Sequence, residues 1–314
     1  MDRVFVSKEL PPEHMQRLEG REVAVWRGDG PVPRETLVEG VREARGLLCM
    51  LTDRIDAALI EQSTELVVIS QVAVGVDNLD LSACVERGIV VGHTPDVLTE
   101  TVADSAFALL ASIVRRIPEG EREVRAGEWG PWQLLHLAGG DLHGTTLGIV
   151  GMGRIGRAIS RRARGFDMDV IYASPTPKEV AAEHVSLPTL LERSDHVVLC
   201  TPLDETTRHL ISFEQLASMK PTAYLVNVAR GPVVDTAALI EALSNGRIAG
   251  AALDVTDPEP LPAGHPLLDL ENCLVVPHIA SASLRTRHAM VSLAVDNLLA
   301  GLAGRPLPAP YPIG

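Results

Sequence analysis

Short apolar runs that lack polar alternation recur along the whole chain, and helical patterns separate them. The runs cover residues 4–6, 22–26, 46–51, 66–70 and 89–91, and then 147–150, 170–173, 196–200, 224–228, 251–254 and 273–276. Strands buried on both faces have such continuous Val- and Ile-rich sequences, and strands that alternate with helices form parallel sheets with right-handed crossovers. The pattern predicts an α/β protein with two parallel sheets.

A longer helical pattern divides the two groups of strands. Thr99 opens it, apolar positions over residues 100–117 form a wide stripe, and Pro118 is expected to end it. A polar, glycine-rich stretch with two tryptophans follows at 127–144. Loops of that length inside compact proteins are usually functional or form an interface. Packing of both tryptophans on their own subunit remains the alternative.

Composition narrows the class of protein. The length of 314 residues predicts about two domains, and 46% hydrophobic with 22% charged residues is typical of a soluble globular protein. The longest apolar stretches, such as 103–114, are too short to span a membrane, and the N-terminus lacks the pattern of a signal peptide. The net charge of −13 argues against partners such as nucleic acid or anionic lipid.

The four cysteines are scattered through the chain without a CxxC pair, at Cys49, Cys84, Cys200 and Cys273. This argues against a disulfide framework and against a zinc site, and it favours a reducing compartment. We therefore expect a cytoplasmic protein that holds no metal.

A glycine motif follows the strand predicted at 147–150 and leads directly into a helical pattern. Gly151 permits a tight turn, Gly153 allows the backbone to approach a pyrophosphate, and Gly156 lets the helix pack closely on the strand. The N-terminus of that helix offers free N–H groups to phosphates. Because the strand–turn–helix context is present, the motif predicts dinucleotide binding, with a glycine turn of no such function as the alternative.

The end of the next strand bears on the choice between NAD and NADP. An acidic residue there would bind the ribose hydroxyls, but the chain carries no carboxylate before Glu179. Ser174, Thr176 and Lys178 could instead hold a 2′-phosphate, which favours NADP. NAD stays open, because no arginine stands where a phosphate clamp is often found.

Three polar residues stand just beyond late strands of the second half, where open α/β sheets place their ligands. They are Arg230, Glu259 and His278. Taken singly, each has a structural explanation: Arg230 as a surface charge, Glu259 as part of a turn, and His278 as a packed histidine. Together they fit hydride transfer to a 2-oxo acid: a guanidinium holds the carboxylate and polarises the ketone, a histidine donates the proton, and a carboxylate favours the charged, oriented imidazolium.

The segments GIVGMGRIG, NVARG, DVTDPEP and PHIAS, in this order and spacing, resemble the signatures of the D-2-hydroxyacid dehydrogenase family. VAVGVDN and VGHTPDVLTETVADSAFALL extend the resemblance over nearly the whole chain. Within the family the chain is most similar to glyoxylate/hydroxypyruvate reductases, on the stretches HTPDVLTETVAD, GEWGPWQLLHLAGGDLHG and LDVTDPEPLPAGHPLLDLENCLVVPHIASASLRTR. One departure is Ala280, where relatives often carry glycine, and its methyl group could narrow the substrate pocket.

The resemblance implies a role for each site residue. It makes Arg230 the substrate clamp, His278 the general acid and Glu259 its partner, while the backbone N–H groups of Val74 and Gly75 would bind the substrate carboxylate. For the cofactor it implies Gly153, Arg154 and Ile155 at the pyrophosphate, Val228 along the nicotinamide pocket, and Asp254 at the carboxamide.

The resemblance also implies a Rossmann coenzyme domain, residues 99–283, inserted in a flavodoxin-like substrate domain made of residues 1–98 and 284–314. It implies a homodimer with the long helix and the tryptophan loop in the contact. We hypothesise that Trp132 reaches toward the active site of the neighbouring subunit. The alternatives are another 2-hydroxyacid dehydrogenase, such as a phosphoglycerate-like one, and a dinucleotide-sensing protein without catalysis, although such a sensor needs no proton donor.

Overall fold

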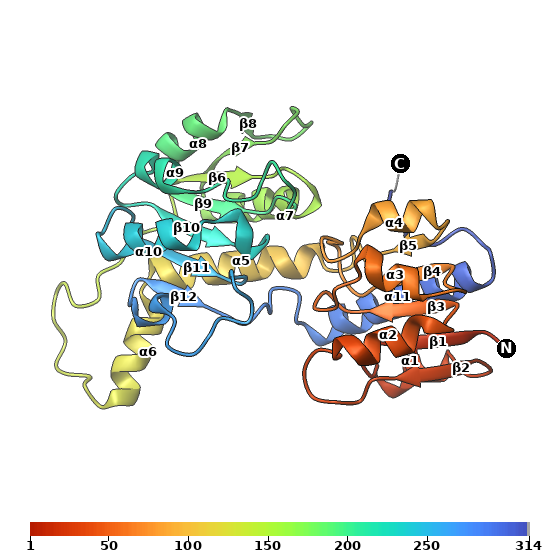
Figure 1. Ribbon diagram of the computed structural model, residues 1–314. Helices are drawn as coiled ribbons and strands as arrows, with labels where there is room; N and C mark the ends of the chain where they lie inside the picture. Colours follow the sequence, from red (N-terminus) through yellow and green to blue (C-terminus); the bar gives the residue numbers. More distant parts are fainter. Residues whose placement is uncertain (313–314) are drawn as a thin grey trace. The chain divides into compact units, whose positions relative to one another are not determined.

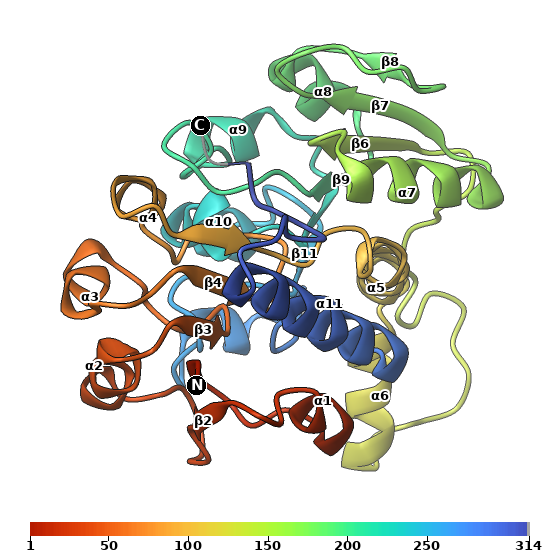
Figure 2. The ribbon, with the colours of Figure 1, turned by 90° about the vertical axis from the view of Figure 1, so that its right-hand side faces the viewer.

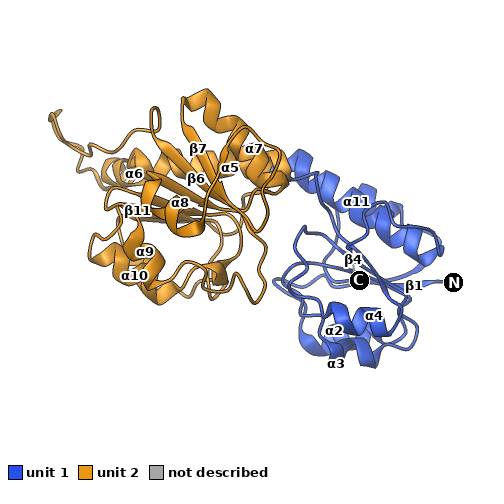
Figure 3. Ribbon diagram, turned by 90° about the horizontal axis from the view of Figure 1, so that it is seen from above, with its two compact units in different colours: residues 1–98, 283–314 blue, residues 99–282 orange. Residues whose placement is uncertain are grey.

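The computed structural model describes residues 1–312 and divides into two compact units. Unit 1 consists of residues 1–98 and 283–314, and unit 2 of residues 99–282 (Figure 3). Both sheets are wholly parallel, so the predicted α/β class with two parallel sheets is confirmed. In the described part of the chain, no helix is long and apolar enough to cross a membrane.

Unit 1 is built on a five-stranded sheet of order β2-β1-β3-β4-β5, the flavodoxin-like arrangement. Its strands are β1 (Arg3–Val6), β2 (Glu22–Val25), β3 (Gly46–Cys49), β4 (Val68–Gln71) and β5 (Val90–Gly92). Its helices are α1 (Pro12–Gln16), α2 (Arg34–Arg42), α3 (Ala57–Gln62), α4 (Leu81–Glu86) and α11 (Leu284–Leu302). Helix α11 packs on β3, β4 and β5, while α2, α3 and α4 cover the other face (Figures 2 and 3).

Close packing of α11 on this sheet depends on small residues. A side chain at Gly301 would meet Val68 at 2.5 Å, and one at Gly46 would meet Leu298 at 2.7 Å. The buried amide of Asn297 adds a polar link, since its Nδ2 donates to the carbonyl of His93 at 2.9 Å. The C-terminal helix is thus an integral part of the unit formed by the first 98 residues.

Unit 2 is built on a seven-stranded sheet of order β12-β11-β10-β9-β6-β7-β8, which is the Rossmann order with one strand added. Its strands are β6 (Thr146–Val150), β7 (Asp169–Ala173), β8 (Glu183–His184), β9 (His196–Leu199), β10 (Tyr224–Asn227), β11 (Gly250–Leu253) and β12 (Cys273–Val275). Its α-helices are α5 (Thr99–Val114), α6 (Ile117–Ala126), α7 (Arg154–Ala163), α8 (Leu187–Arg193), α9 (Phe213–Ser218) and α10 (Thr236–Ser244). Helices α5 and α7 lie on one face and α8, α9 and α10 on the other (Figure 1).

The predicted end of the long helix was wrong. Helix α5 already stops at Val114, and Arg116 adopts a left-handed conformation with φ of 53°. Pro118 then stands in the first turn of α6, where its missing N–H costs nothing. Pro118 therefore helps to start a second helix, and it does not end the first.

The predicted loop follows α6, with neither helix nor strand between Ala126 and Thr146 in the described chain. Trp129 and Trp132 are 75% and 83% exposed, so packing of both tryptophans on their own subunit is wrong.

Candidate active site

Three neighbouring parallel strands carry the predicted catalytic residues at their carboxyl ends. Strands β10, β11 and β12 pair side by side, so the segments that follow them emerge at one edge of the sheet. Arg230 follows β10, Glu259 follows β11, and His278 follows β12. The placement after strand ends is the one expected for a ligand site in an open α/β sheet.

The structure brings His278 and Glu259 into direct contact. His278 Nδ1 lies 2.6 Å from Glu259 Oε1, and the two side chains keep 23% and 35% of their surface exposed. Because Nδ1 faces the carboxylate, Nε2 is the ring nitrogen that can meet a substrate. The carboxylate thus fixes the orientation of the ring and leaves Nε2 as the atom available to a substrate.

Electrostatics favour a charged carboxylate in this pair. Burial raises the pKa of Glu259, but the hydrogen bond and charge of His278 outweigh that effect, helped by the Thr256 amide and by the charge of Arg230. The net result is a Glu259 pKa below its ordinary value. Glu259 is thus an anion at neutral pH, poised to stabilise positive charge on His278.

Asp254 fixes the backbone around the histidine, a function that the sequence did not suggest. Its Oδ1 accepts hydrogen bonds from the amides of Ile279 at 2.7 Å and of Ala280 at 3.0 Å. The N–H of His278, a residue with φ of 52°, donates to the Asp254 carbonyl at 2.8 Å. Burial raises the pKa of Asp254, while the two amides lower it, and the net pKa stays above its ordinary value.

Hydrogen bonds from Asn227 and a close backbone contact at Gly231 position Arg230. Asn227 Oδ1 accepts from the Ala229 amide at 3.0 Å, and its Nδ2 donates to the Arg230 carbonyl at 2.9 Å. The next residue is Gly231, where a Cβ would lie only 1.9 Å from the carbonyl oxygen of Thr256. The Arg230 turn therefore rests directly on the turn that leads to Glu259. Neither Asn227 nor Gly231 was singled out as a site residue from sequence, although both lie in or beside the NVARG segment.

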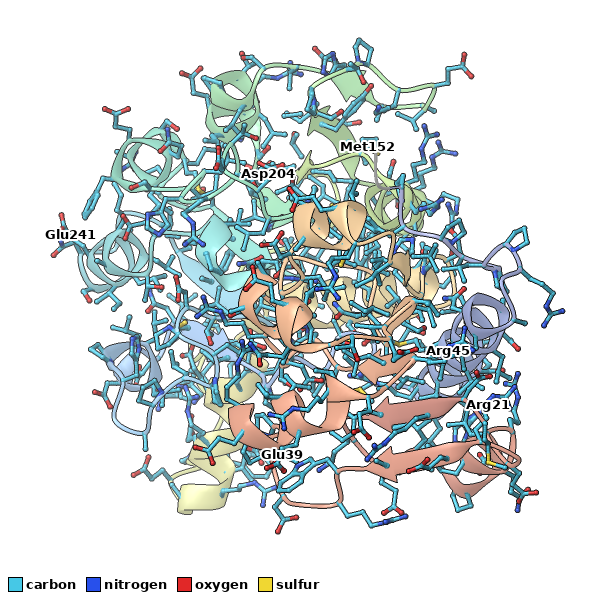
Figure 4. The ribbon with its side chains drawn as sticks, turned by 45° about the vertical axis from the view of Figure 1, so that its right-hand side comes forward. Arg21, Glu39, Arg45, Met152, Asp204 and Glu241 are labelled. Atoms are coloured by element: carbon cyan, nitrogen blue, oxygen red, sulfur yellow. The ribbon has the colours of Figure 1, made fainter. Side chains whose placement is uncertain are left out.

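The glycine motif after β6 has the geometry of a tight turn into α7. Gly151 has φ of +99°, and a Cβ at Gly156 would meet the Gly151 carbonyl oxygen at 2.2 Å. At Gly153, by contrast, a Cβ would meet no described atom within 4 Å, so the backbone there is open to a ligand. Met152 between them is 1% exposed and anchors the turn in the core (Figure 4). Gly153 is the N-cap residue of α7, with Arg154 and Ile155 as the first two helical residues.

The loop after β7 collects the polar groups predicted to meet a 2′-phosphate. Ser174 Oγ donates to the Thr176 carbonyl at 3.0 Å, and Lys178 Nζ lies 2.8 Å from Thr176 Oγ1. Arg157 on α7 also reaches this loop, where its guanidinium donates to the Glu179 carbonyl at 3.0 Å. Arg157 was not predicted as part of this loop, because it comes from the preceding helix and not from the residues after the strand.

The remaining predicted residues divide between the units. Val228 follows β10 in unit 2 and is 7% exposed. Val74 and Gly75 lie in unit 1, between β4 and α4. Their carbonyls accept from His93 Nδ1 at 2.9 Å and from Gln71 Nε2 at 2.6 Å. Their amides donate no hydrogen bond within residues 1–312, so they are free to bind an anion.

Comparison with known proteins identifies the class. Residues 107–280 match the model of the D-isomer specific 2-hydroxyacid dehydrogenase, NAD binding domain. The chain belongs to this family, and it is accordingly an oxidoreductase with a nicotinamide dinucleotide cofactor. The matched range includes the glycine turn and the positions of Arg230, Glu259 and His278.

Individual relatives extend the likeness over nearly the whole chain. A glyoxylate reductase of Korarchaeum cryptofilum is 47% identical over 95% of this chain and 92% of its own length. Human glyoxylate reductase/hydroxypyruvate reductase is 45% identical over 98% of this chain and 97% of its own length. Among solved structures, the TT0316 protein of Thermus thermophilus has a TM-score of 0.94 at 49% identity, covering 99% of this chain and 100% of that one. An NADPH-dependent glyoxylate/hydroxypyruvate reductase of Sinorhizobium meliloti, in complex with NADP and malonate, has a TM-score of 0.88 at 35% identity. The likeness covers 99% of this chain and 96% of that one.

Proposed function

We propose that this protein is an NAD(P)H-dependent glyoxylate/hydroxypyruvate reductase that yields the D-2-hydroxy acid. The observation that carries the proposal is the 2.6 Å contact between His278 Nδ1 and Glu259 Oε1 beside the Arg230 turn. A family member that only senses dinucleotide has no use for a proton donor held in this way. Relatives named as such reductases, at 45–47% identity, support the substrate class.

The residues around the ketone each supply one part of the reaction. Arg230 holds the substrate carboxylate and polarises the carbonyl, a task that suits a planar guanidinium. When bound, the nicotinamide would supply the hydride that forms the new C–H bond at C2, and His278 Nε2 would give the former carbonyl oxygen its proton. Glu259 stabilises the imidazolium before the transfer and orients the ring. Within unit 1, the amides of Val74 and Gly75 form the predicted anion-binding turn.

The residues of unit 2 fit a dinucleotide. The backbone at Gly153 is open, while the turn before it is fixed by the positive φ of Gly151. The first turn of α7, at Arg154 and Ile155, presents backbone N–H groups and the positive end of a helix dipole to the pyrophosphate. On the nicotinamide side, Val228 would supply an apolar wall, and Asp254 would be the partner of the carboxamide.

For the choice of cofactor we favour NADP. Ser174, Thr176 and Lys178 lie together after β7, and Arg157 reaches the same loop. Two cations and two hydroxyls can bind a 2′-phosphate, and residues 174–178 contain no carboxylate that would repel it. Lys178→Ala is expected to lower kcat/KM with NADPH about tenfold, the scale of one charged hydrogen bond, and to leave NADH kinetics unchanged. Equal losses with both cofactors would contradict this assignment.

We further propose that the protein acts as a cytoplasmic homodimer. The segment after α6 exposes four large apolar side chains, Trp129, Trp132, Leu134 and Leu135. Such an exposed apolar group usually marks an interaction surface, and here we assign it to a second copy, with Trp132 directed toward the partner's active site. Trp132→Ala should weaken dimerisation in analytical ultracentrifugation or change KM. An unaltered dimer with unaltered kinetics would rule out this role. The four thiols, all free in the structure, suit the reducing cytoplasm.

The direct test follows loss of NADPH and NADH absorbance with glyoxylate, hydroxypyruvate, pyruvate and phosphohydroxypyruvate. We expect turnover with the first two to exceed turnover with the last two. Preference for phosphohydroxypyruvate would identify a phosphoglycerate-like enzyme. Cofactor binding without oxidation by any of the four acids would overturn the proposal and favour a sensor.

A further inference from the structure

Unit 1 contains a cluster of two histidines and a glutamate that the proposed reaction does not use. Glu13 and His14 lie on α1, and His288 lies in the second turn of α11, beside which α1 packs (Figure 2). His288 Nδ1 is 2.8 Å from Glu13 Oε1 and 3.4 Å from His14 Nε2. His14 Nε2 is 4.0 Å from the same carboxylate oxygen.

We propose that Glu13, His14 and His288 form a binding site for a divalent transition metal, with Zn²⁺ as the ion that fits best. Imidazole nitrogens and a carboxylate oxygen are regular zinc ligands, with bonds of about 2.0–2.2 Å. Tetrahedral geometry then places neighbouring ligand atoms about 3.3 Å apart. The three observed separations, 2.8, 3.4 and 4.0 Å, lie on both sides of that value.

The two outer ligands can adjust and the inner one is fixed. The side chains of Glu13 and His288 are 55% and 47% exposed, so small rotations can bring them to coordination distance. His14 is only 7% exposed. A fixed inner ligand and two adjustable outer ones leave the fourth position of a tetrahedral ion open to water.

The buried ring of His14 is poorly satisfied without an ion. Its Nε2, the ring atom that faces the cluster, has only the long 3.4 Å contact with His288 Nδ1 and lies 4.0 Å from Glu13 Oε1. A metal bond at Nε2 would give this ring the strong interaction that it lacks.

The surrounding charges do not oppose a cation. Arg17 lies one turn further along, but its guanidinium is paired with Asp296 and donates to Ser292 Oγ at 3.0 Å. Once this pair is counted as neutral, Glu13 leaves a net negative charge at the cluster. The three ligands come from opposite ends of the chain, so the ion would act as a clamp between the first and last helices of unit 1 and would stabilise that unit.

The test uses the full-length protein after treatment with a chelator. Titration with ZnCl₂ in a calorimeter should show one ion bound per chain, and Zn²⁺ should raise Tm because it binds the folded state. Co²⁺ should give the intense visible absorption of a four-coordinate ion. His288→Ala and Glu13→Gln should each weaken Zn²⁺ binding at least about tenfold, the loss that follows even from removal of outer-shell partners.

A matched control comes from His136, whose Nε2 lies 2.7 Å from Glu123 in an exposed pair that belongs to no three-ligand group among residues 1–312. His136→Ala should leave Zn²⁺ affinity and the Co²⁺ spectrum unchanged. The proposal is overturned if the parent protein binds no Zn²⁺, if neither Glu13→Gln nor His288→Ala weakens binding, or if His136→Ala weakens it equally. Because the readouts are metal binding and Tm, the result is independent of the reductase assays.

Discussion

The contact of Gly231 with the Thr256 carbonyl offers a measurable link between backbone packing and catalysis. In Gly231→Ala the new methyl carbon would lie 1.9 Å from the Thr256 oxygen and 2.1 Å from its carbonyl carbon. A carbon atom and a carbonyl oxygen approach to about 3.3 Å, so the two turns must separate by about 1.4 Å. Both neighbouring atoms belong to the backbone and cannot rotate away. The separation therefore moves Arg230 relative to the turn that carries Glu259.

The expected cost has two parts. Overpacking of this kind destabilises a protein by about 1–3 kcal/mol. Displacement of a positioning group by about 1 Å lowers the rate about 100-fold. We therefore expect kcat/KM for glyoxylate to fall about 100-fold, with a raised KM because Arg230 holds the carboxylate. NADPH affinity, measured by fluorescence titration, should change little.

Gly165→Ala is the matched control, because a Cβ at Gly165 meets no described atom within 4 Å. It should leave kcat/KM and the unfolding free energy close to the parent values. If Gly231→Ala folds and keeps parental kcat/KM, the close approach of the two turns does not position Arg230, and the geometric argument is refuted.

Three further predictions concern charge and burial. Glu259→Gln removes the charged partner that orients the His278 ring and should lower kcat with glyoxylate about tenfold or more, with NADPH affinity unchanged; parental kcat would speak against the pairing. Burial lowers the pKa of His196 in the folded protein. As the pH falls below 6.5, the unfolded chain therefore takes up a proton before the folded one does, and the free energy of unfolding should decrease. Urea unfolding of His196→Asn should show a weaker decline. Asp254→Ala leaves two amides without their acceptor and should lower the free energy of unfolding by about 1–3 kcal/mol for each amide. It should also lower kcat; an unaltered kcat would show that Asp254 does not position the catalytic residues.

The strands and their order of appearance could be predicted because a parallel sheet buried on both faces needs continuous apolar runs. Each of the runs identified from the sequence overlaps a strand of the structure. Strand β8, with two exposed residues, has no such signal. The division of the long helix was missed because it depends on the left-handed backbone at Arg116, which no periodicity reports.

The catalytic candidates were predictable for a related reason. Parallel strands deliver the residues that follow them to one sheet edge, so Arg230, Glu259 and His278 could be grouped without coordinates. The groups that hold them were not predictable, since Asp254 and Gly231 act through contacts with segments about 25 residues away. Sequence spacing carries even less information about His14 and His288, which are 274 residues apart and meet only after α11 returns to unit 1.

The measurement that bears most directly on the proposed reaction is turnover and cofactor affinity of His278→Ala, with His143→Ala, an exposed histidine, as the control. General acid catalysis contributes about 10²–10⁴-fold, so kcat with glyoxylate should fall within that range. The dissociation constant for NADPH should stay near the parental value, and the control should match the parent in both. Parental turnover in His278→Ala would show that another group donates the proton and would contradict the account.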